Sequence, residues 1–374
     1  MNTTVPDFMI NKIWTAKAGS TSPLIIAEIG TSHQGSISRA KEMIDAAGES
    51  GAECIKVQHV YADEIIHPRT GMVPLPGGDT ALYEVFRSLE TGPSFLEEIK
   101  EHAEKQGLVF LCTPFGARSL LELIQAGCSV IKIASPELNH IPLLQLIAEN
   151  RLKTILSTGV SRLSDIEEAL ETLQGCSTAL LHCITSYPAP EEEYNLSLLP
   201  HISTLFGIPV GVSDHSMDPL LVPLGALYFG VCCIEKHFTI DRKSGGLDDL
   251  VALPPEEFSK MTSAVNYWAV RPKEELYSFL ADEFGTERIH NVFGSGKKNL
   301  AESEKENYGR SNRSIHAARE IMPGDVLHAD TIAVLRTEKE LRPGLHPRYI
   351  KQLTGRTARR QIPDGEGIRW EDIL

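Results

Sequence analysis

The sequence predicts an α/β protein, a (β/α)8 TIM barrel followed by a small β-rich domain. Eight short apolar runs rich in Ile, Val and Leu recur through the first 240 residues. Their nearly continuous apolarity is typical of parallel strands that are buried on both faces. Segments with helical periodicity separate the runs, and eight such alternations in roughly 250 residues are the pattern of this barrel.

The expected strands and helices follow one another along the first part of the chain. The strands are expected at 24–30, 54–60, 108–114, 130–135, 153–159, 178–185, 209–216 and 232–239. Three intervening helices have recognisable ends: 38–50 begins at a serine, 93–106 stops before Gly107, and 164–173 stops just before Gln174-Gly175. The main alternative is a doubly wound open sheet. The turn Gly30-Thr-Ser-His-Gln-Gly35 after the first run argues against it, because it is not a dinucleotide fingerprint.

A change in composition marks the end of the barrel. We expect the barrel to occupy residues 1–285, a charged surface linker 286–312, and a small β-rich domain 313–374. Turn signals such as Met322-Pro-Gly-Asp325 and Pro363-Asp-Gly365 punctuate the last segment. A unit of about 62 residues is marginal by itself, so we expect it to dock on another part of the protein.

Composition excludes several classes of function. A net charge of −14 argues against nucleic acid as a partner, since phosphate backbones are bound by basic surfaces. No apolar run approaches the roughly 20 residues of a membrane span, and the polar N-terminus lacks a signal pattern, so we expect a cytoplasmic protein. Seven cysteines without Cys-x-x-Cys spacing indicate buried free thiols rather than disulfides or zinc ligands.

Polar side chains gather where the expected strands end, which is where a barrel of this kind carries its chemistry. A single buried lysine is usually paired with a carboxylate, and a single hydroxyl has no special meaning. Two lysines and several hydroxyls at one barrel mouth instead predict a cradle for phosphate or carboxylate. The residues concerned are Glu28, Lys56, Gln58, Thr113, Lys132, Ser135, Glu137, Ser157, Thr185, Tyr187 and Ser213.

Two histidines close the last two expected strands, His215 in Ser213-Asp-His215 and His237 in Glu235-Lys-His237. A lone histidine is more often a hydrogen-bonded core residue than a ligand. If the two strands are neighbours, however, both imidazoles reach one mouth and can share a divalent metal. Few protein ligands and nearby carboxylates favour Mn²⁺ or Mg²⁺ over a closed zinc site. Such a metal polarises a carbonyl oxygen as a Lewis acid.

Eight short motifs in order resemble the sialic acid (nonulosonate) synthase family, which includes N-acetylneuraminate, legionaminate and pseudaminate synthases. The tail from Arg313-Ser-Ile-His316 through Arg342-Pro-Gly344 is similar to that family's antifreeze-like (SAF) domain. The motifs are Ile26-Ala-Glu-Ile-Gly30, Ile55-Lys-Val-Gln58, Cys112-Thr-Pro-Phe115, Ile131-Lys-Ile-Ala-Ser-Pro-Glu137, Leu156-Ser-Thr-Gly159, Leu181-His-Cys183 with Tyr187-Pro-Ala-Pro190, Gly211-Val-Ser-Asp-His215 and Glu235-Lys-His-Phe-Thr239.

The resemblance implies a transferase that condenses phosphoenolpyruvate with the open-chain aldehyde of an N-acylated amino sugar and releases phosphate, for surface polysaccharide or glycan biosynthesis. It assigns a metal to His215 and His237, with Mn²⁺ expected and Mg²⁺ or Co²⁺ as alternatives. Phosphoenolpyruvate is assigned to Lys56, Thr113, Lys132, Ser135, Ser157 and Ser213. Contacts to the sugar or the reacting centre are assigned to Glu28, Gln58, Glu137, Thr185, Tyr187 and Asp248.

Two further expectations rest on the same resemblance. Arg342 matches an arginine that reaches the neighbouring subunit's active site, which implies a domain-swapped homodimer. Glu28 or Glu137 is expected to orient or deprotonate the water that attacks C2. We expect Glu137→Gln to lose condensation while keeping the fold.

The motifs depart from the neuraminate pattern mainly at sugar positions, in Pro76-Gly-Gly-Asp79, at Thr185 and in Gly245-Gly-Leu-Asp-Asp249. We expect an N-acetylneuraminate synthase-like function, with pseudaminate or legionaminate synthase as alternatives. A synthase of seven- or eight-carbon keto acids is a second possibility, which the antifreeze-like tail disfavours. A non-catalytic sugar-binding homologue is a third, which the complete set of lysines and histidines disfavours.

Overall fold

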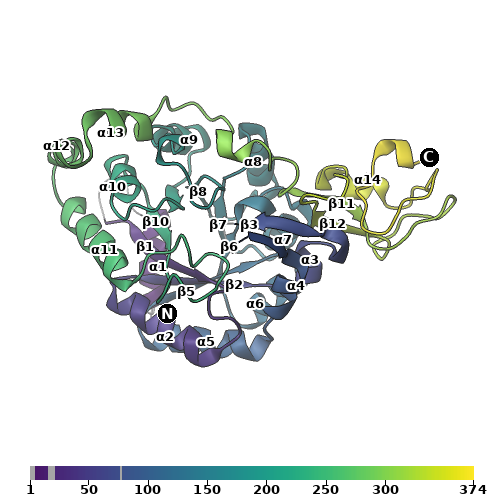
Figure 1. The fold of residues 1–374 in the computed structure, drawn as a ribbon, viewed down its shortest axis with the longest axis horizontal. Helices are drawn as coiled ribbons and strands as arrows, with labels where there is room; N and C mark the ends of the chain where they lie inside the picture. The colour runs from purple at the N-terminus through teal and green to yellow at the C-terminus, as the bar shows by residue number, and fades with distance from the viewer. Residues whose placement is uncertain (1–4, 16–21, 76–77) are drawn as a thin grey trace.

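In the computed structural model, which describes residues 5–15, 22–75 and 78–374, eight parallel strands close into a barrel (Figure 1). The strands are β1 (Leu24–Gly30), β2 (Cys54–His59), β5 (Val109–Pro114), β6 (Val130–Ile133), β7 (Lys153–Ser157), β8 (Thr178–His182), β9 (Val210–Asp214) and β10 (Cys233–His237). Each lies within one of the eight apolar runs. The barrel closes where β1 pairs with β10, so the predicted TIM barrel is confirmed.

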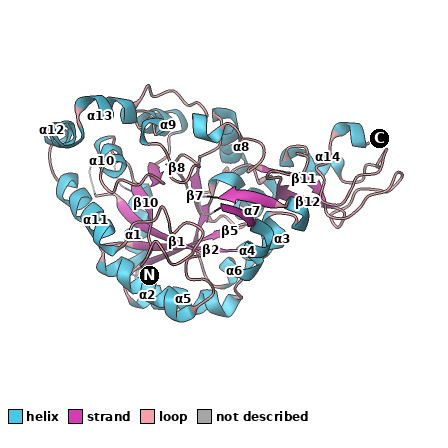
Figure 2. Ribbon diagram, viewed as in Figure 1, coloured by secondary structure: helices cyan, strands magenta, loops and turns pink. Residues whose placement is uncertain are grey.

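Helices surround the strands on the outside of the barrel, as Figure 2 shows. They are α2 (Ile37–Glu49), α5 (Pro93–Lys105), α6 (Ala117–Gln125), α7 (Ile141–Glu149), α8 (Leu163–Thr172), α9 (Leu198–Phe206), α10 (Leu221–Tyr228) and α11 (Pro255–Ala269). The expected helices 38–50, 93–106 and 164–173 correspond to α2, α5 and α8 within one residue at each end. The Ser36 hydroxyl caps α2 by accepting a hydrogen bond from the Arg39 amide.

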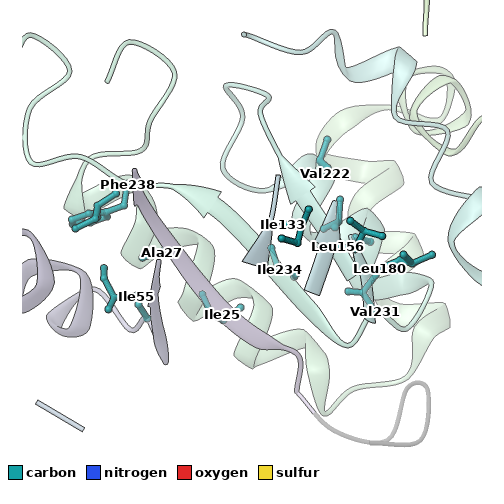
Figure 3. Close-up of a cluster of buried hydrophobic side chains, with 14 of the residues drawn as sticks. Ile25, Ala27, Ile55, Ile133, Leu156, Leu180, Val222, Val231, Ile234 and Phe238 are labelled. Carbon is teal, nitrogen blue, oxygen red and sulfur yellow. The ribbon is translucent and has the colours of Figure 1, made fainter. Parts of the chain in front are cut away.

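Alternate residues of each strand face the helices and the barrel interior. In β1 and β2, Ile25, Ala27 and Ile55 belong to the core between strands and helices, which Figure 3 shows in close-up. Leu24, Ile26 and the equivalent residues of the other strands form a separate apolar cluster inside the barrel. Helix α1 (Val5–Thr15), which the sequence did not predict, adds Ile10 and Ile13 to this cluster and covers the amino-terminal end of the strands.

A long segment between β2 and α5 also escaped prediction. It contains α3 (Ala62–Ile65), the antiparallel strands β3 (Met72–Leu75) and β4 (Gly78–Ala81), and α4 (Leu82–Ser88). Its side chains pack with Phe115 in a third apolar cluster. The departure noted at Pro76-Gly-Gly-Asp79 lies partly outside the described residues, since 76–77 are not among them.

After the barrel, α12 (Lys273–Phe284) and α13 (Thr286–Phe293) pack on α10, so a helix occupies the first part of the expected linker. The small domain follows with β11 (Arg313–Ala317), β12 (Ile332–Arg336) and α14 (Ile350–Leu353). It has its own apolar core around Ile315, Leu327 and Ile368. Figure 1 shows it projecting from the side of the barrel next to α3. No helix of the described residues is long and apolar enough to cross a membrane.

A buried ion pair fastens the small domain to the barrel. The Arg313 guanidinium is fully enclosed and donates hydrogen bonds to Glu137 Oε1 at 2.9 Å and to the carbonyls of Phe115 and Ile65 at 2.9 and 3.2 Å. Arg336 donates to the same carboxylate oxygen at 2.7 Å. The expected docking of this domain therefore depends on charged groups that are removed from water.

Candidate active site

The interior-facing residues change from apolar to polar along the barrel axis. Leu24, Cys54 and Cys233 belong to the apolar layer near α1. Moving along each strand in steps of two residues leads from these positions to Glu28, Lys56 and Glu235. The same parity places the lysine of β6, the serines of β7 and β9, and the histidine of β10 inside the barrel. The two-residue period of the strands therefore points these predicted site residues into the barrel at the carboxyl-terminal ends of the strands.

A cavity of about 730 Å³ opens at this mouth. Most predicted site residues line it together. They are Lys56, Gln58, Lys132, Ser135, Ser157, Thr185, Tyr187, Ser213, His215, His237 and Asp248. The linker and the small domain of the same chain complete the rim with residues that sequence reasoning missed, namely Glu302, Ser303, Lys305, Glu306, Asn307, Ser311, Arg336, Glu338 and Lys339.

The two lysines of the predicted anion cradle lie together at the mouth. Lys132 Nζ donates to the Ser157 hydroxyl at 2.6 Å, and Lys56 is ion-paired with Glu28. Burial lowers the pKa of Lys132. Burial alone would also lower the pKa of Lys56, but the carboxylates of Glu235 and Glu28 outweigh it and raise that pKa. Both ammonium groups are almost wholly removed from water, so an arriving anion meets cations with little solvent screening.

Glu235 is a site residue that the sequence analysis did not assign. Its carboxylate lies 3.5 Å from Lys132 Nζ and 3.9 Å from Lys56 Nζ, and it accepts a hydrogen bond from the Ser213 hydroxyl at 2.8 Å. Burial would raise its pKa, yet the two lysines outweigh that effect and lower it. Glu235 is thus a counter-ion shared by the two lysines. Its place in Glu235-Lys-His237, two residues before a predicted ligand, was the available signal.

Glu28 lies directly against the cradle. Gln58 Nε2 donates to its Oε1 at 3.1 Å, and burial raises the pKa of the carboxyl to about 7, with Lys56 opposing the rise. Gly30 keeps this corner open, because a Cβ there would lie 3.2 Å from Glu28 Oε1 and 3.6 Å from Asp248 Oδ2. A carboxyl group with such a pKa can take up or release a proton near neutral pH.

The two histidines are neighbours, with ring centroids 5.4 Å apart. His215 Nδ1 donates to the Ile184 carbonyl at 2.7 Å, which makes Nε2 the acceptor nitrogen, 3.3 Å from the hydroxyl oxygens of both Tyr187 and Ser213. Burial lowers the pKa of His215 to about 4 and that of His237 well below its ordinary value. Both rings are therefore neutral and able to ligate a metal.

The donor set fits a metal with few protein ligands. His237 Nδ1 lies 3.8 Å from the nearest Asp248 oxygen, so the two groups are close without forming a hydrogen bond. Within residues 5–15, 22–75 and 78–374, no cluster of three or more His, Cys, Asp and Glu is arranged to hold a metal. The chain thus offers two imidazoles, and a metal here would need oxygen ligands from water or substrate.

Glu137 has a structural role that the sequence did not predict. This carboxylate is fully buried outside the cavity, where Arg313 and Arg336 both donate to its Oε1. It is held in the contact between the two domains by these two arginines. The motif Ser135-Pro-Glu137 gave no hint of this, because both partners come from the tail.

Glu28, Thr113 and Arg342 are likewise absent from the cavity lining. Thr113 is fully buried in β5, where it pairs in register with Gln58 and, two residues after Leu111 of the interior cluster, faces the barrel interior. Arg342 donates to the Gly367 carbonyl at 2.7 Å and to Asp372 at 2.8 Å, within the small domain. It does not line the cavity of its own chain.

Two family models match this chain. The NeuB family model matches residues 43–271, and the SAF domain model matches residues 312–374. The chain belongs to the NeuB family. The predicted sialic acid synthase resemblance and the predicted SAF domain are therefore both confirmed.

Relatives in the NeuB family cover nearly the whole chain. Spore coat polysaccharide biosynthesis protein SpsE of Bacillus subtilis is 34% identical over 363 residues, which are 95% of each chain. N,N'-diacetyllegionaminic acid synthase of Campylobacter jejuni is 31% identical over 92% of this chain and 98% of the relative. The SpsE crystal structure superposes with a TM-score of 0.79 at 33% identity, covering 97% of this chain and 98% of SpsE. The barrel and the SAF domain thus occur together in these relatives.

Proposed function

We propose that this NeuB-family protein is a nonulosonate synthase, which condenses phosphoenolpyruvate with the aldehyde of an N-acylated amino sugar. The observation that carries the proposal is the pairing of the Lys56 and Lys132 cradle with two neutral imidazoles in one cavity. Relatives named as legionaminic acid, pseudaminic acid and N-acetylneuraminate-9-phosphate synthases support it. Release of inorganic phosphate from phosphoenolpyruvate in the presence of such a sugar tests it.

The cradle side chains bind and orient the first substrate. Lys56 and Lys132 neutralise the phosphate and carboxylate of phosphoenolpyruvate, and the Ser157 hydroxyl, which accepts from Lys132, donates a hydrogen bond to this substrate. Glu235, which lies near both lysines, keeps their ammonium groups facing the cavity. This arrangement fixes the enol carbon C3 toward the second substrate.

The bond changes follow from the two substrates. C3 of phosphoenolpyruvate attacks the aldehyde carbon, and the aldehyde oxygen gains a proton and becomes a hydroxyl. Water adds to the electron-poor C2, and phosphate leaves by cleavage of the bond between C2 and its bridging oxygen. We assign to Glu28 the orientation of this water and the uptake of its proton, because its pKa near 7 suits that exchange.

A divalent metal belongs to the proposal as well. His215 and His237 would hold it, and we propose Mn²⁺, with Mg²⁺ and Co²⁺ as alternatives. When bound, it supplies Lewis-acid polarisation of the aldehyde oxygen. Tyr187, whose ring stacks on His215 at 4.3 Å between centroids, and the Ile184 carbonyl orient that imidazole in advance.

Removing the metal should abolish phosphate release, and added Mn²⁺ should restore it. His237→Ala should lose high-affinity Mn²⁺ binding, measured by isothermal titration calorimetry, while the thermal midpoint changes little. His201→Ala is the matched control, because His201 lies on α9 and its Nδ1 contacts the Gly296 carbonyl. Unchanged Mn²⁺ binding in His237→Ala would remove the histidine pair from the proposal.

Glu28→Gln and Glu137→Gln should affect different properties. We expect Glu28→Gln to lower turnover by roughly 100- to 10,000-fold, the usual contribution of a general acid–base group. Glu137→Gln should instead lower the free energy of unfolding, because it uncharges the partner of Arg313 and Arg336. Steady-state kinetics and urea unfolding of both variants separate the two roles. Near-normal turnover of Glu28→Gln would exclude it as the proton acceptor.

A domain-swapped homodimer also belongs to the proposal. Arg342 does not line the cavity of its own chain, which is expected of an arginine that contributes to the active site of a neighbouring subunit. At a phosphoenolpyruvate concentration where Arg342→Ala and Lys132→Met each turn over slowly by themselves, mixing the two variants should raise the activity above their sum, because each mixed dimer contains one complete site. No recovery after subunit exchange would exclude the swap.

The cytoplasmic location remains a prediction that cell fractionation tests.

A further inference from the structure

Another buried ion pair directly precedes the two histidines in sequence. Lys236 Nζ donates to Asp214 Oδ2 at 2.6 Å, and both side chains are fully removed from water. Asp214 comes immediately before His215, and Lys236 immediately before His237. Neither member of the pair lines the cavity, because successive residues of a strand point to opposite faces. The pair therefore lies on the outer face of the barrel strands and is not part of the cavity surface.

The surroundings of this pair are suited to apolar side chains. Along the same outer faces, Val210 and Val212 of β9 and Ile234 of β10 belong to the core between strands and helices. Replacing a buried ion pair by well-packed apolar residues is often neutral for stability or even stabilising. Stability alone therefore does not explain a lysine and an aspartate at these two positions, which points to a role in placing neighbouring groups.

The pair is the last connection between β9 and β10. The two strands pair in register from Ile234 opposite Val212 to Lys236 opposite Asp214. Each histidine lies one residue beyond that last pair, and in the described part of the chain no strand pairing joins one histidine directly to the other. The ion pair thus fixes the separation of the two strand ends at the residues next to the histidines.

Lys236 also holds the turn that follows His215. Its Nζ donates to the Ser216 carbonyl at 2.6 Å as well as to Asp214, and Asp214 Oδ1 accepts from the Ser216 amide at 2.8 Å. The His215 amide itself donates to the hydroxyl of buried Tyr194 at 2.6 Å. The backbone on both sides of the His215 imidazole is therefore bonded to the pair or to the core, which leaves the ring little freedom to shift.

We propose that Asp214 and Lys236 are positioning residues for the divalent metal, which hold the imidazoles of His215 and His237 at the spacing that one ion requires. The inference rests on the metal site of the proposed function and adds two residues to it. Because the chain offers only two imidazoles, any freedom of the strand ends has to be lost when the ion binds, and that loss weakens binding. Partners that orient metal ligands contribute roughly 10- to 100-fold to metal affinity.

Mn²⁺ binding to the metal-free full-length protein, measured by isothermal titration calorimetry, tests the inference without an assay of turnover. Lys236→Met keeps the length of the side chain and removes its charge. The double variant Asp214→Asn/Lys236→Met removes both charges, so no buried charge is left without a partner. We expect the Kd for Mn²⁺ to rise by roughly 10- to 100-fold in both variants. The Kd for phosphoenolpyruvate should stay at the wild-type value, because the cradle lysines lie on β2 and β6.

Arg313→Met is the matched control, because it breaks another fully buried ion pair, with Glu137, at the contact between the two domains. It should lower the thermal midpoint and leave the Kd for Mn²⁺ unchanged. Wild-type Mn²⁺ affinity in the folded variants of the pair, or an equal loss in Arg313→Met, would overturn the inference. If neither variant of the pair folded, Asp214→Asn alone would decide between these outcomes, since it keeps the side-chain shape and the acceptor for the Ser216 amide.

The same titration separates this inference from the proposed function. Mn²⁺ binding by the wild-type protein, with an unchanged Kd in the variants, sustains the metal site and overturns only the role of the ion pair. No Mn²⁺ binding by the wild-type protein counts against the metal site of the proposed function itself and overturns the inference with it.

Discussion

Replacing Lys132 by methionine should lower kcat/KM for phosphoenolpyruvate by roughly 30- to 3,000-fold. This range is the tenfold-per-1.4 kcal/mol equivalent of the 2–5 kcal/mol that loss of one partner of a buried charge pair costs. Lys132 is almost fully buried, so water cannot replace its ammonium group beside the bound anion. Ser157 also loses its 2.6 Å hydrogen-bond donor. The loss should appear mainly in the KM for phosphoenolpyruvate and in its directly measured affinity.

The matched control for this change is Lys153→Met. Lys153 is on the adjacent strand β7, but at its opposite end, where Nζ donates to the Asn11 side chain at 2.7 Å. This variant should keep wild-type kinetics. Calorimetric titration of both variants with phosphoenolpyruvate separates binding from turnover. If Lys132→Met bound phosphoenolpyruvate with wild-type affinity, Lys132 would not be part of the phosphoenolpyruvate site.

Replacing Arg313 by methionine should lower the free energy of unfolding by about 3–5 kcal/mol, the usual cost of removing one member of a buried ion pair. Glu137 would keep Arg336 as its only cation, and the Phe115 and Ile65 carbonyls would lose their buried donor. We expect the SAF domain to detach from the barrel before the barrel unfolds. Urea unfolding followed by tryptophan fluorescence and by limited proteolysis of residues 294–312 measures the two events.

Arg359→Met is the control for the interdomain ion pair, because Arg359 is an exposed arginine of the same domain. It should unfold like the wild type and resist protease equally. A single unfolding transition of wild-type stability in Arg313→Met would show that the ion pair does not hold the domains together.

Strands and interior residues were predictable because local rules determine them. Each of β1 to β10 that forms the barrel lies in an apolar run, since burial on both faces leaves that signature in sequence. The two-residue period of a strand then places Lys56, Ser213 and His237 inside the barrel without further information. Helix α1 was missed because its purpose, to cover the open end of the barrel with Ile10 and Ile13, is visible only once the barrel is closed.

Glu137 and Glu235 show where sequence reasoning stopped. Both are carboxylates at the ends of strands, and nothing local distinguishes a catalytic group from a counter-ion. Glu137 proved to be neutralised by Arg313 and Arg336, which lie 176 and 199 residues further along the chain. Glu235 was left unassigned, although it contacts both cradle lysines. The partner of a buried charge is set by distance in space, and sequence separation carries no information about it.

By itself the sequence determined the barrel, the SAF domain, the family, and the presence of a lysine cradle and a histidine pair at one mouth. The barrel, the lysines and the histidine pair follow from periodicity and from residue type at strand ends, which are local properties, whereas the family and the SAF domain follow from the resemblance of the motifs. Only the tertiary structure decided which carboxylate meets which cation, how the SAF domain docks through Arg313, and that Val73, Phe86 and Leu247 line one cavity. Those features depend on side chains from distant segments packing together, which only the closed fold determines.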